Sequence, residues 1–170
     1  MKHATKPMQL LLGIALATTL AIIGQIESRA AELKWTEPFD VAKQEAKRSG
    51  KPMLVFIGNI EVCKDCQAFV KSVCTQPDFV DYAATDLICT RVLYSKSDSK
   101  EERWKKSRIY ESFNIPSSHA VIIANADGKR IGELSAKPQS IAAFIQDIKT
   151  IIAKAPPEGA VEVFGGRDVR

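Results

Sequence analysis

Residues 53–73 read MLVFIGNIEVCKDCQAFVKSV, and this stretch decides the fold. It opens with an unbroken apolar run, Met53–Ile57, which predicts a strand buried on both of its faces. It closes with the helix-patterned segment Gln67–Val73, and Cys63 and Cys66 lie between the two. We therefore expect a strand, a loop over Gly58–Val62 and a helix that begins at the cysteine pair.

The position of the two cysteines has a chemical consequence. If the second lies one helical turn after the first, both sulfurs can meet at the N-terminus of the helix. There the unpaired backbone N–H groups and the positive end of the helix dipole favour a thiolate. The thiolate is the form that attacks disulfides, and a free cysteine with a pKa of about 8.5 supplies little of it at neutral pH. The spacing therefore indicates a dithiol with one activated member.

The first thirty residues have the pattern of a secretory signal peptide. Lys2 and Lys6 give a basic start, Leu10–Ile26 is an apolar run, and Ser28-Arg29-Ala30 offers a cleavage site. The alternative is an uncleaved membrane anchor, since the run approaches the roughly 20 residues that span a bilayer. The small-residue site favours cleavage. Either way, we expect residues 31–170 to be periplasmic or secreted, and held at a membrane only if the segment is retained.

The rest of the chain has the size of one domain, about 140 residues. We divide the sequence into a signal peptide or anchor over 1–30, a domain over 31–154 and a flexible tail over 155–170. The full chain carries 24 Lys and Arg against 20 Asp and Glu. This near balance argues against nucleic acid as a partner. We expect a monomer.

Turn and periodicity signals predict the other elements. The clearest is a hairpin, with Ala120–Ala124 and Lys129–Leu134 as strands around an Asn125-Ala126-Asp127-Gly128 turn. Right-handed crossovers make the earlier strands parallel, and the hairpin adds antiparallel partners. The expected fold is α/β, a three-layer α/β/α sandwich with a mixed central sheet. Its further elements are helices over Pro38–Ser49, after Pro77, over Glu101–Phe113 and over Pro138–Ala153, and an inner strand over Leu87–Tyr94.

Three landmarks resemble proteins of the thioredoxin fold. They are Cys63-Lys64-Asp65-Cys66 after the first inner strand, Ile115-Pro116 before the hairpin and Asp127-Gly128 at its tip. The resemblance covers roughly residues 34–153. More narrowly, the segments Phe39-Asp40-Val41-Ala42, Gly50-Lys51-Pro52 and Thr75–Val80 are similar to one branch of the family. That branch holds periplasmic thioredoxin-like proteins and the C-terminal domain of the transmembrane thiol–disulfide interchange reductases.

The resemblance implies a cis peptide bond between Ile115 and Pro116, beside the dithiol. In the family, the backbone there pairs with an extended substrate segment. A cis X–Pro bond lies only about 0.5–1 kcal/mol above the trans form, so a fold can hold it. The alternative is an ordinary trans proline that ends the helix over Glu101–Phe113. The hairpin that follows favours the cis bond.

The resemblance also implies a role for each residue of the cysteine motif. Cys63 is the attacking thiolate, and Cys66, one turn further and more buried, resolves the mixed disulfide. Lys64 favours a Cys63 thiolate and Asp65 opposes it, so both tune the redox balance. The implied partners are cysteine-containing protein substrates and a redox partner protein. Neither a cofactor nor a metal is expected.

The sequence departs from the family around the motif. Val62 stands where members usually carry tryptophan before the first cysteine. The buried carboxylate that assists proton transfer in many thioredoxins is replaced by Val55 or Ile57. Asp65 or Glu61 would then have to accept the proton from outside the core.

The remaining candidate ligands allow more than one interpretation. Cys74 and Cys89 are either small buried hydrophobes or a second disulfide, and we favour the first. A zinc site at the cysteine pair would need a second close pair of ligands. His119 has no second ligand near it in sequence, so we interpret it as an ordinary loop residue. The alternative is that it points back toward the dithiol and tunes it, because a nearby imidazolium lowers the pKa of a thiol. Trp35, Trp104 and Phe113 are expected in the core, with the helix over Glu101–Phe113 buried through Trp104, Ile109 and Tyr110.

Two functions of different classes remain. The first is an extracytoplasmic thiol–disulfide oxidoreductase. A reductase, an oxidase and an isomerase share these residues, so the direction of exchange stays open. The second is a binding or chaperone-like module that keeps the fold with a static disulfide. The dithiol at a helix start favours the oxidoreductase.

Overall fold

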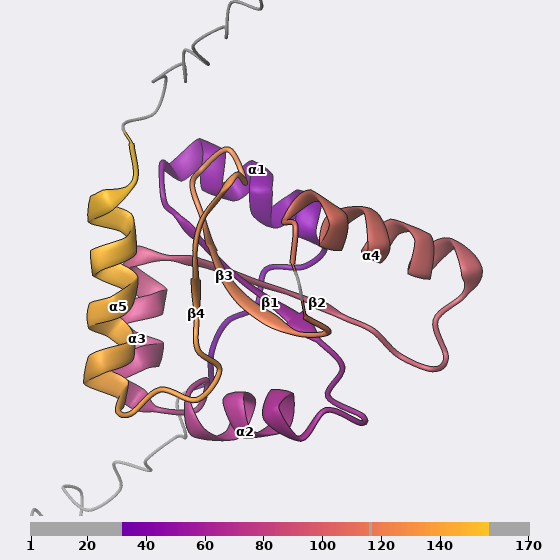
Figure 1. The fold of residues 1–170 in the computed structure, drawn as a ribbon. Coiled ribbons are helices and arrows are strands. Elements are labelled where there is room, and N and C mark those ends of the chain that lie inside the picture. The colour runs from indigo at the N-terminus through magenta and orange to yellow at the C-terminus, as the bar shows by residue number, and fades with distance from the viewer. Residues whose placement is uncertain (1–31, 116, 157–170) are drawn as a thin grey trace, which may run out of the picture. The chain divides into compact units, whose positions relative to one another are not determined.

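The structure is a computed structural model that describes residues 32–115 and 117–156 (Figure 1). The predicted signal peptide, Pro116 and nearly all of the predicted tail lie outside the described residues, so the proposed division of the chain stays a prediction. In the described part, the elements follow the expected order, with two successive helices between the first two strands and a final hairpin and helix. The elements are α1 (Phe39–Ser49), β1 (Met53–Gly58), α2 (Lys64–Ser72), α3 (Pro77–Asp86), β2 (Ile88–Leu93), α4 (Lys100–Ser112), β3 (Ala120–Ala124), β4 (Arg130–Leu134) and α5 (Ile141–Lys154).

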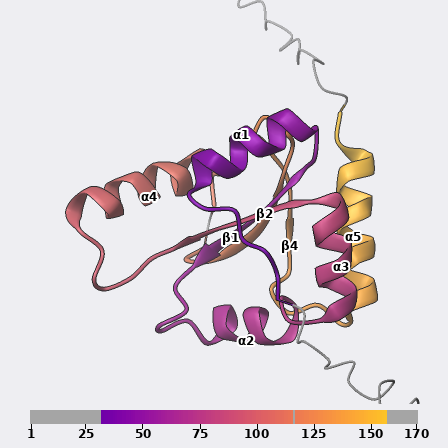
Figure 2. The same ribbon diagram turned by 180° about the vertical axis from the view of Figure 1, so that it is seen from behind.

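The four strands form one mixed sheet in the order β2-β1-β3-β4. Strand β1 pairs with β2 in parallel and with β3 antiparallel, and β3 and β4 form the predicted hairpin. Helices α1 and α4 pack on one face, and α2, α3 and α5 pack on the other, where α3 and α5 lie side by side (Figures 1 and 2). This confirms the three-layer sandwich.

The core follows from the alternation of side chains along β1, every residue of which is buried. Leu54 and Phe56 point into the cluster beneath α2, α3 and α5, whereas Val55 and Ile57 point into the cluster beneath α1. Successive strand residues face opposite sides, so a strand covered on both sides must be apolar throughout. This is the pattern that the sequence predicted for Met53–Ile57.

Local signals fix the ends of two helices. Gly50 ends α1 with φ 68, in the left-handed region that glycine adopts without strain. Ser99 opens α4 with a capping box, in which its hydroxyl accepts from the Glu102 N–H and the Glu102 carboxylate accepts from the Ser99 N–H. A cis peptide bond that the sequence did not predict joins Glu37 to Pro38.

One expected inner strand is an edge strand. β2 lies at the end of the sheet, because no later strand pairs with its outer side within the described residues. The segment before α1 covers part of this edge, where the Thr36 N–H donates to the Cys89 carbonyl at 2.7 Å.

The expected burial of α4 through Trp104 is wrong. Trp104 is 63% exposed and no residue of α4 is buried. The helix contacts the core through Ile109 and Tyr110, near its C-terminal end, while its N-terminal end points away from the sheet in both views (Figures 1 and 2). Six of the seven residues before Ser107 are lysine, arginine or glutamate. This half of the helix therefore has no apolar face to bury. Phe113 is buried in the cluster beneath α1, and Trp35 is partly buried against the cluster on the other face of the sheet.

No helix among residues 32–115 and 117–156 is long and apolar enough to cross a membrane.

Candidate active site

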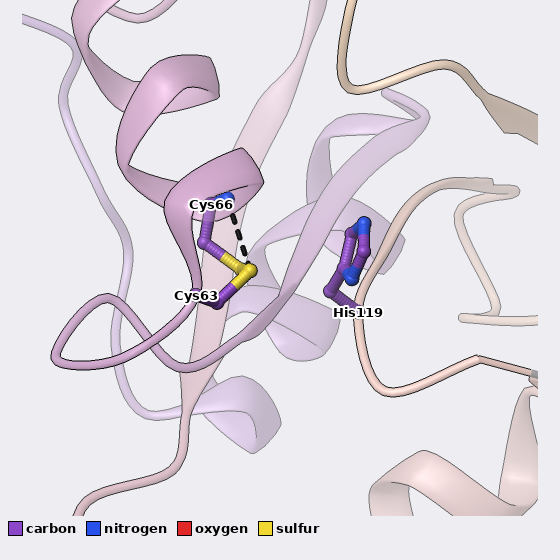
Figure 3. A group of neighbouring side chains, drawn as sticks. All are labelled: Cys63, Cys66 and His119. Carbon is purple, nitrogen blue, oxygen red and sulfur yellow. Dashed lines mark hydrogen bonds between the residues drawn. A yellow bond between two sulfur atoms is a disulfide. The ribbon is translucent and has the colours of Figure 1, made fainter.

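The cysteine pair lies where β1 ends and α2 begins. The chain leaves the sheet at Gly58, crosses a short loop and enters α2 with Cys63 as the N-cap residue. Cys66 follows in the first turn, and the two are joined by a disulfide with their Cα atoms 5.2 Å apart (Figure 3). This is the placement that the sequence predicted, with both sulfurs at a helix N-terminus.

The two sulfurs differ in exposure and in hydrogen bonding. Cys63 is half-buried, and Cys66 is fully buried. The Cys66 N–H donates to the Cys63 Sγ at 3.1 Å, as Figure 3 shows. After reduction, this donor and the helix dipole would both favour negative charge on Cys63. The arrangement therefore suits Cys63 to attack and Cys66 to resolve.

The buried sulfur of Cys66 rests against the last residue of β1. A Cβ atom placed on Gly58 would lie 2.7 Å from the Cys66 Sγ. Real Cβ atoms do not approach a sulfur so closely, so only glycine fits here without a shift of the disulfide.

Hydrogen bonds hold the loop between Gly58 and Cys63 in place. The Cys63 N–H donates to the Asn59 carbonyl at 2.9 Å, and the Gln67 side chain donates to the Ile60 carbonyl at 2.8 Å. The Ser95 hydroxyl donates to the Glu61 carboxylate, and this bond lowers the pKa of Glu61 from its ordinary value. Glu61 is thus engaged in fixing the loop, which makes it a poor proton acceptor for Cys66.

The two residues between the cysteines have unequal surroundings. Lys64 is exposed, whereas Asp65 forms an ion pair with Lys137, 2.7 Å away, in the segment between β4 and α5. The hydrogen bond from Lys137 lowers the pKa of Asp65. Asp65 is therefore ionised and paired near neutral pH, so that its opposition to a Cys63 thiolate is weakened.

The interior beside the pair offers no replacement for the family's buried acid. Val55 and Ile57 are fully buried and apolar. Among the described residues the only buried carboxylate is that of Asp98, which accepts from Lys106 at 2.6 Å and from the Ser95 N–H at 2.9 Å. Among the described residues, no buried carboxylate is therefore available to take the proton that leaves Cys66.

The structure brings a third group, His119, to the cysteines, in agreement with the interpretation that the sequence analysis did not favour. One ring nitrogen of His119 and the two sulfurs lie within 4.8 Å of one another (Figure 3). His119 directly precedes β3, and β3 places Ala120 opposite Ile57 of β1. Residue 119 therefore comes beside the end of β1, from which the chain leads to Cys63. The strand pairing of the predicted hairpin with β1 was the signal that could have found it.

A cavity of about 490 Å³ opens beside Cys63. Tyr94 and Tyr110 form one wall, with ring centroids 6.4 Å apart in an edge-to-face arrangement. The Tyr110 hydroxyl also donates to the Ser117 carbonyl. The sequence analysis did not identify this cavity, because its residues come from the loop before α2, the residue after β2, helix α4 and the segment before β3. The lining residues are Asn59, Val62, Cys63, Tyr94, Ser107, Tyr110 and Ser118.

The predicted substrate-binding pair is described only in part. Ile115 is buried in the cluster beneath α1. Pro116 lies outside the described residues, so the cis bond between them stays a prediction.

Cys74 and Cys89 are free thiols buried in the cluster beneath α2, α3 and α5. Burial raises the pKa of each to about 12. They behave as small apolar side chains in the core, the interpretation that we favoured.

Part of the chain matches a family of known proteins. Residues 34–117, which include both cysteines of the motif, match the family model described as thioredoxin-like. No curated protein matches the chain by sequence.

Solved structures share the fold at low sequence identity. A DsbH oxidoreductase is 20% identical, with a TM-score of 0.66, over 74% of this chain and 88% of its own. A putative disulphide-isomerase from Bacteroides thetaiotaomicron is 13% identical, with a TM-score of 0.56, over 76% of this chain and 100% of its own. A thioredoxin from Thermus thermophilus is 20% identical, with a TM-score of 0.53, over 72% and 89%.

The strand order, the cysteine pair at the start of α2 and the match over residues 34–117 agree with one another. Residues 34–117 therefore form a thioredoxin-like segment, within a chain that has the thioredoxin-like fold.

Proposed function

We propose that the protein is an extracytoplasmic thiol–disulfide oxidoreductase that exchanges disulfides with cysteine-containing proteins. The observation that carries this proposal is the Cys63–Cys66 disulfide at the N-terminus of α2, with the Cys66 N–H directed at the Cys63 sulfur. A static bridge would not need a half-exposed sulfur that the helix start prepares to carry negative charge. The family and the fold of the neighbouring structures agree with this chemistry.

The exchange reaction needs only the two cysteines, the partner's disulfide and protons from solvent. The Cys63 thiolate attacks a disulfide of the partner, forms a mixed disulfide and releases one partner thiolate, which takes a proton from solvent. Cys66 then loses its proton and attacks the Cys63 sulfur, which releases the second partner thiolate. Two electrons pass from the Cys63–Cys66 dithiol to the partner. The reverse sequence oxidises a partner dithiol, and a redox partner protein resets the enzyme in either direction.

We assign the partner's contact surface to the cavity beside Cys63. Its wall of Tyr94 and Tyr110 is apolar with polar edges, and Val62 at its rim is 59% exposed. Such a surface suits an apolar side chain that neighbours the partner's cysteine. The extracytoplasmic location is supported by the basic start and apolar run of residues 1–30.

Trapping of mixed disulfides tests the proposal. The Cys66→Ser variant should accumulate covalent adducts with cysteine-containing proteins, because it can attack but not resolve. The Cys63→Ser variant should form none and should lose catalysed exchange. Cys74→Ala is the matched control, since it removes a thiol buried away from the site, and it should behave as wild type. Exchange by Cys63→Ser at the wild-type rate would refute the assignment.

A further inference from the structure

The reduced form of the site has the donor set of a metal centre. Cys63, Cys66 and His119 form the one group of three or more histidine, cysteine or acidic side chains within the described residues whose ligand atoms gather closely, all within 4.8 Å. Two thiolates and one imidazole match the ligands that zinc takes in sites of the two-cysteine, one-histidine type. We propose that the protein, when its disulfide is reduced, binds one Zn²⁺ ion through these three residues.

The geometry needs only a small change from the oxidised structure. In a tetrahedral zinc site with Zn–S near 2.3 Å and Zn–N near 2.0–2.1 Å, ligand atoms are about 3.5–3.8 Å apart. Reduction frees the two sulfurs to separate to this distance, and His119 has to approach by roughly 1 Å. Cys63 and His119 are both half-buried at the surface, so neither the ion nor water is excluded.

The fourth position is open. Asp65, the nearest acidic residue in sequence, is engaged by Lys137 at 2.7 Å. The cavity beside the site touches Cys63 and also Ser118, the neighbour of His119. Three protein ligands and one position facing a cavity are typical of zinc sites that hold a water molecule or an exchangeable ligand. The site therefore suits Zn²⁺ held by three protein ligands, with its fourth position left open.

Zinc binding depends on the redox state of the cysteine pair. A dithiol or phosphine reductant gives two electrons to the Cys63–Cys66 disulfide, two protons enter from solvent, and the reductant is oxidised. Zn²⁺ then displaces the two thiol protons to buffer as two Zn–S bonds form, and the neutral imidazole nitrogen adds a third bond. The disulfide form offers no thiolate and does not bind. Zinc at 100 times its dissociation constant favours the reduced form by about 100-fold, which raises the apparent potential by about 60 mV.

Anaerobic titration of the full chain with Zn²⁺ tests this inference. The protein is reduced with a phosphine, which does not compete for zinc, and a chromophoric chelator reports the free ion. We expect one Zn²⁺ per reduced chain and none per oxidised chain. Co²⁺ used in its place should show the thiolate charge-transfer and tetrahedral d–d bands of a mixed sulfur–nitrogen site.

Substitutions of His119 and of a thiol outside the site supply matched variants. His119→Ala and the similarly sized His119→Gln should weaken Zn²⁺ binding by more than about tenfold, whereas Cys74→Ala, which removes a buried thiol, should bind as wild type. Circular dichroism checks that each variant is folded. The proposal is overturned if the reduced wild type binds no zinc, or if folded His119 variants bind it as tightly as wild type. Since binding is measured without any exchange reaction, loss of zinc binding with intact exchange refutes this inference alone, and the converse refutes only the oxidoreductase.

Discussion

At the residue scale, the contact between Gly58 and the Cys66 sulfur is the tightest constraint on the disulfide. A methyl group at position 58 would lie 2.7 Å from that sulfur. Gly58→Ala should therefore destabilise the oxidised protein by about 1–3 kcal/mol, as overpacking in a full core does. Denaturant unfolding of the oxidised and reduced forms measures this, and the cost should be larger in the oxidised form, whose sulfur cannot turn away. Equal stability of variant and wild type in the oxidised form would show that the contact is relieved at no cost.

The cysteines should differ in how fast a thiol reagent labels them, because two of them are buried in the core. In the reduced native protein, a thiol reagent at pH 8 should label Cys63 first and leave Cys74 and Cys89 unlabelled until the protein is unfolded. Burial raises the pKa of both to about 12 from the ordinary 9.0, so labelling of the folded state should stay slow even at pH 10. Mass spectrometry after timed labelling counts the modified sites, and rapid native labelling of Cys74 or Cys89 would contradict their placement.

The same shift in pKa has a consequence for stability. The thiol pKa values are higher in the folded state than in the unfolded state. The stabilisation from burying neutral thiols is therefore complete below about pH 9 and is lost as the pH rises from 9 toward 12. Wild type should lose stability over this range more steeply than a Cys74→Ala, Cys89→Ala double variant, as followed by denaturant midpoints. Parallel curves would show that the two thiols ionise as easily in the folded protein as in the unfolded one.

At the element scale, a chain of polar contacts ties the loop before Cys63 to the loop before α4. Lys106 binds Asp98, Asp98 accepts from the Ser95 N–H, and the Ser95 hydroxyl donates to Glu61. Hydrogen bonds lower the pKa of both Asp98 and Glu61 below their ordinary values of 3.8 and 4.5. The contribution to stability is thus present above these values and disappears as the pH falls through the lowered pKa of each.

A substitution at Glu61 tests this link. Glu61→Gln should make the loop more susceptible to limited proteolysis at pH 7, because the amide accepts a weaker hydrogen bond than the carboxylate. As the pH falls through the lowered pKa of Glu61, the wild-type carboxylate gains its proton and the two proteins should be cut at increasingly similar rates. Glu111→Gln, at an exposed position of α4, is a control for the loss of a surface charge. Equal rates of wild type and Glu61→Gln at pH 7 would show that the contact does not hold the loop.

Helix α4 illustrates how burial, rather than residue type, sets stability. Phe113, just after the helix, is 2% exposed, whereas Trp104 is 63% exposed. Phe113→Ala should cost about 3–5 kcal/mol of unfolding free energy, and Trp104→Ala should change it by less than about 0.5 kcal/mol. Denaturant unfolding compares the two. In a Trp35→Phe background, Trp104 fluorescence should be quenched strongly by iodide, and protection from iodide would show that α4 buries this ring.

At the scale of the whole molecule, the sequence predicted what depends on local patterns. The apolar run of β1, the hairpin turn at Asp127-Gly128 and the helix start at Cys63 are local signals, and all three were confirmed. The sheet order was not local, so β2 was taken for an inner strand. Trp104 was placed in the core because aromatic residues usually are, although the charges around it favour an exposed helix.

The candidate site also combines residues that local sequence locates with residues that only the tertiary fold brings together. The cysteine pair could be located from spacing alone, since both thiols come from one turn of one helix. His119 and the cavity wall of Tyr94 and Tyr110 could not, because they reach the pair through strand pairing and helix packing. The ion pair of Asp65 with Lys137 likewise depends on how the segment after β4 folds back toward α2.

A redox titration of the Cys63–Cys66 pair tests the central claim most directly. Purified protein is equilibrated with glutathione buffers, and the dithiol fraction is read by thiol-specific alkylation and mass spectrometry. If the pair cycles with partner proteins, its potential should lie within roughly −270 to −120 mV, the range of known oxidoreductases. A potential well below about −300 mV would contradict the account and identify the bridge as a static support of a binding module.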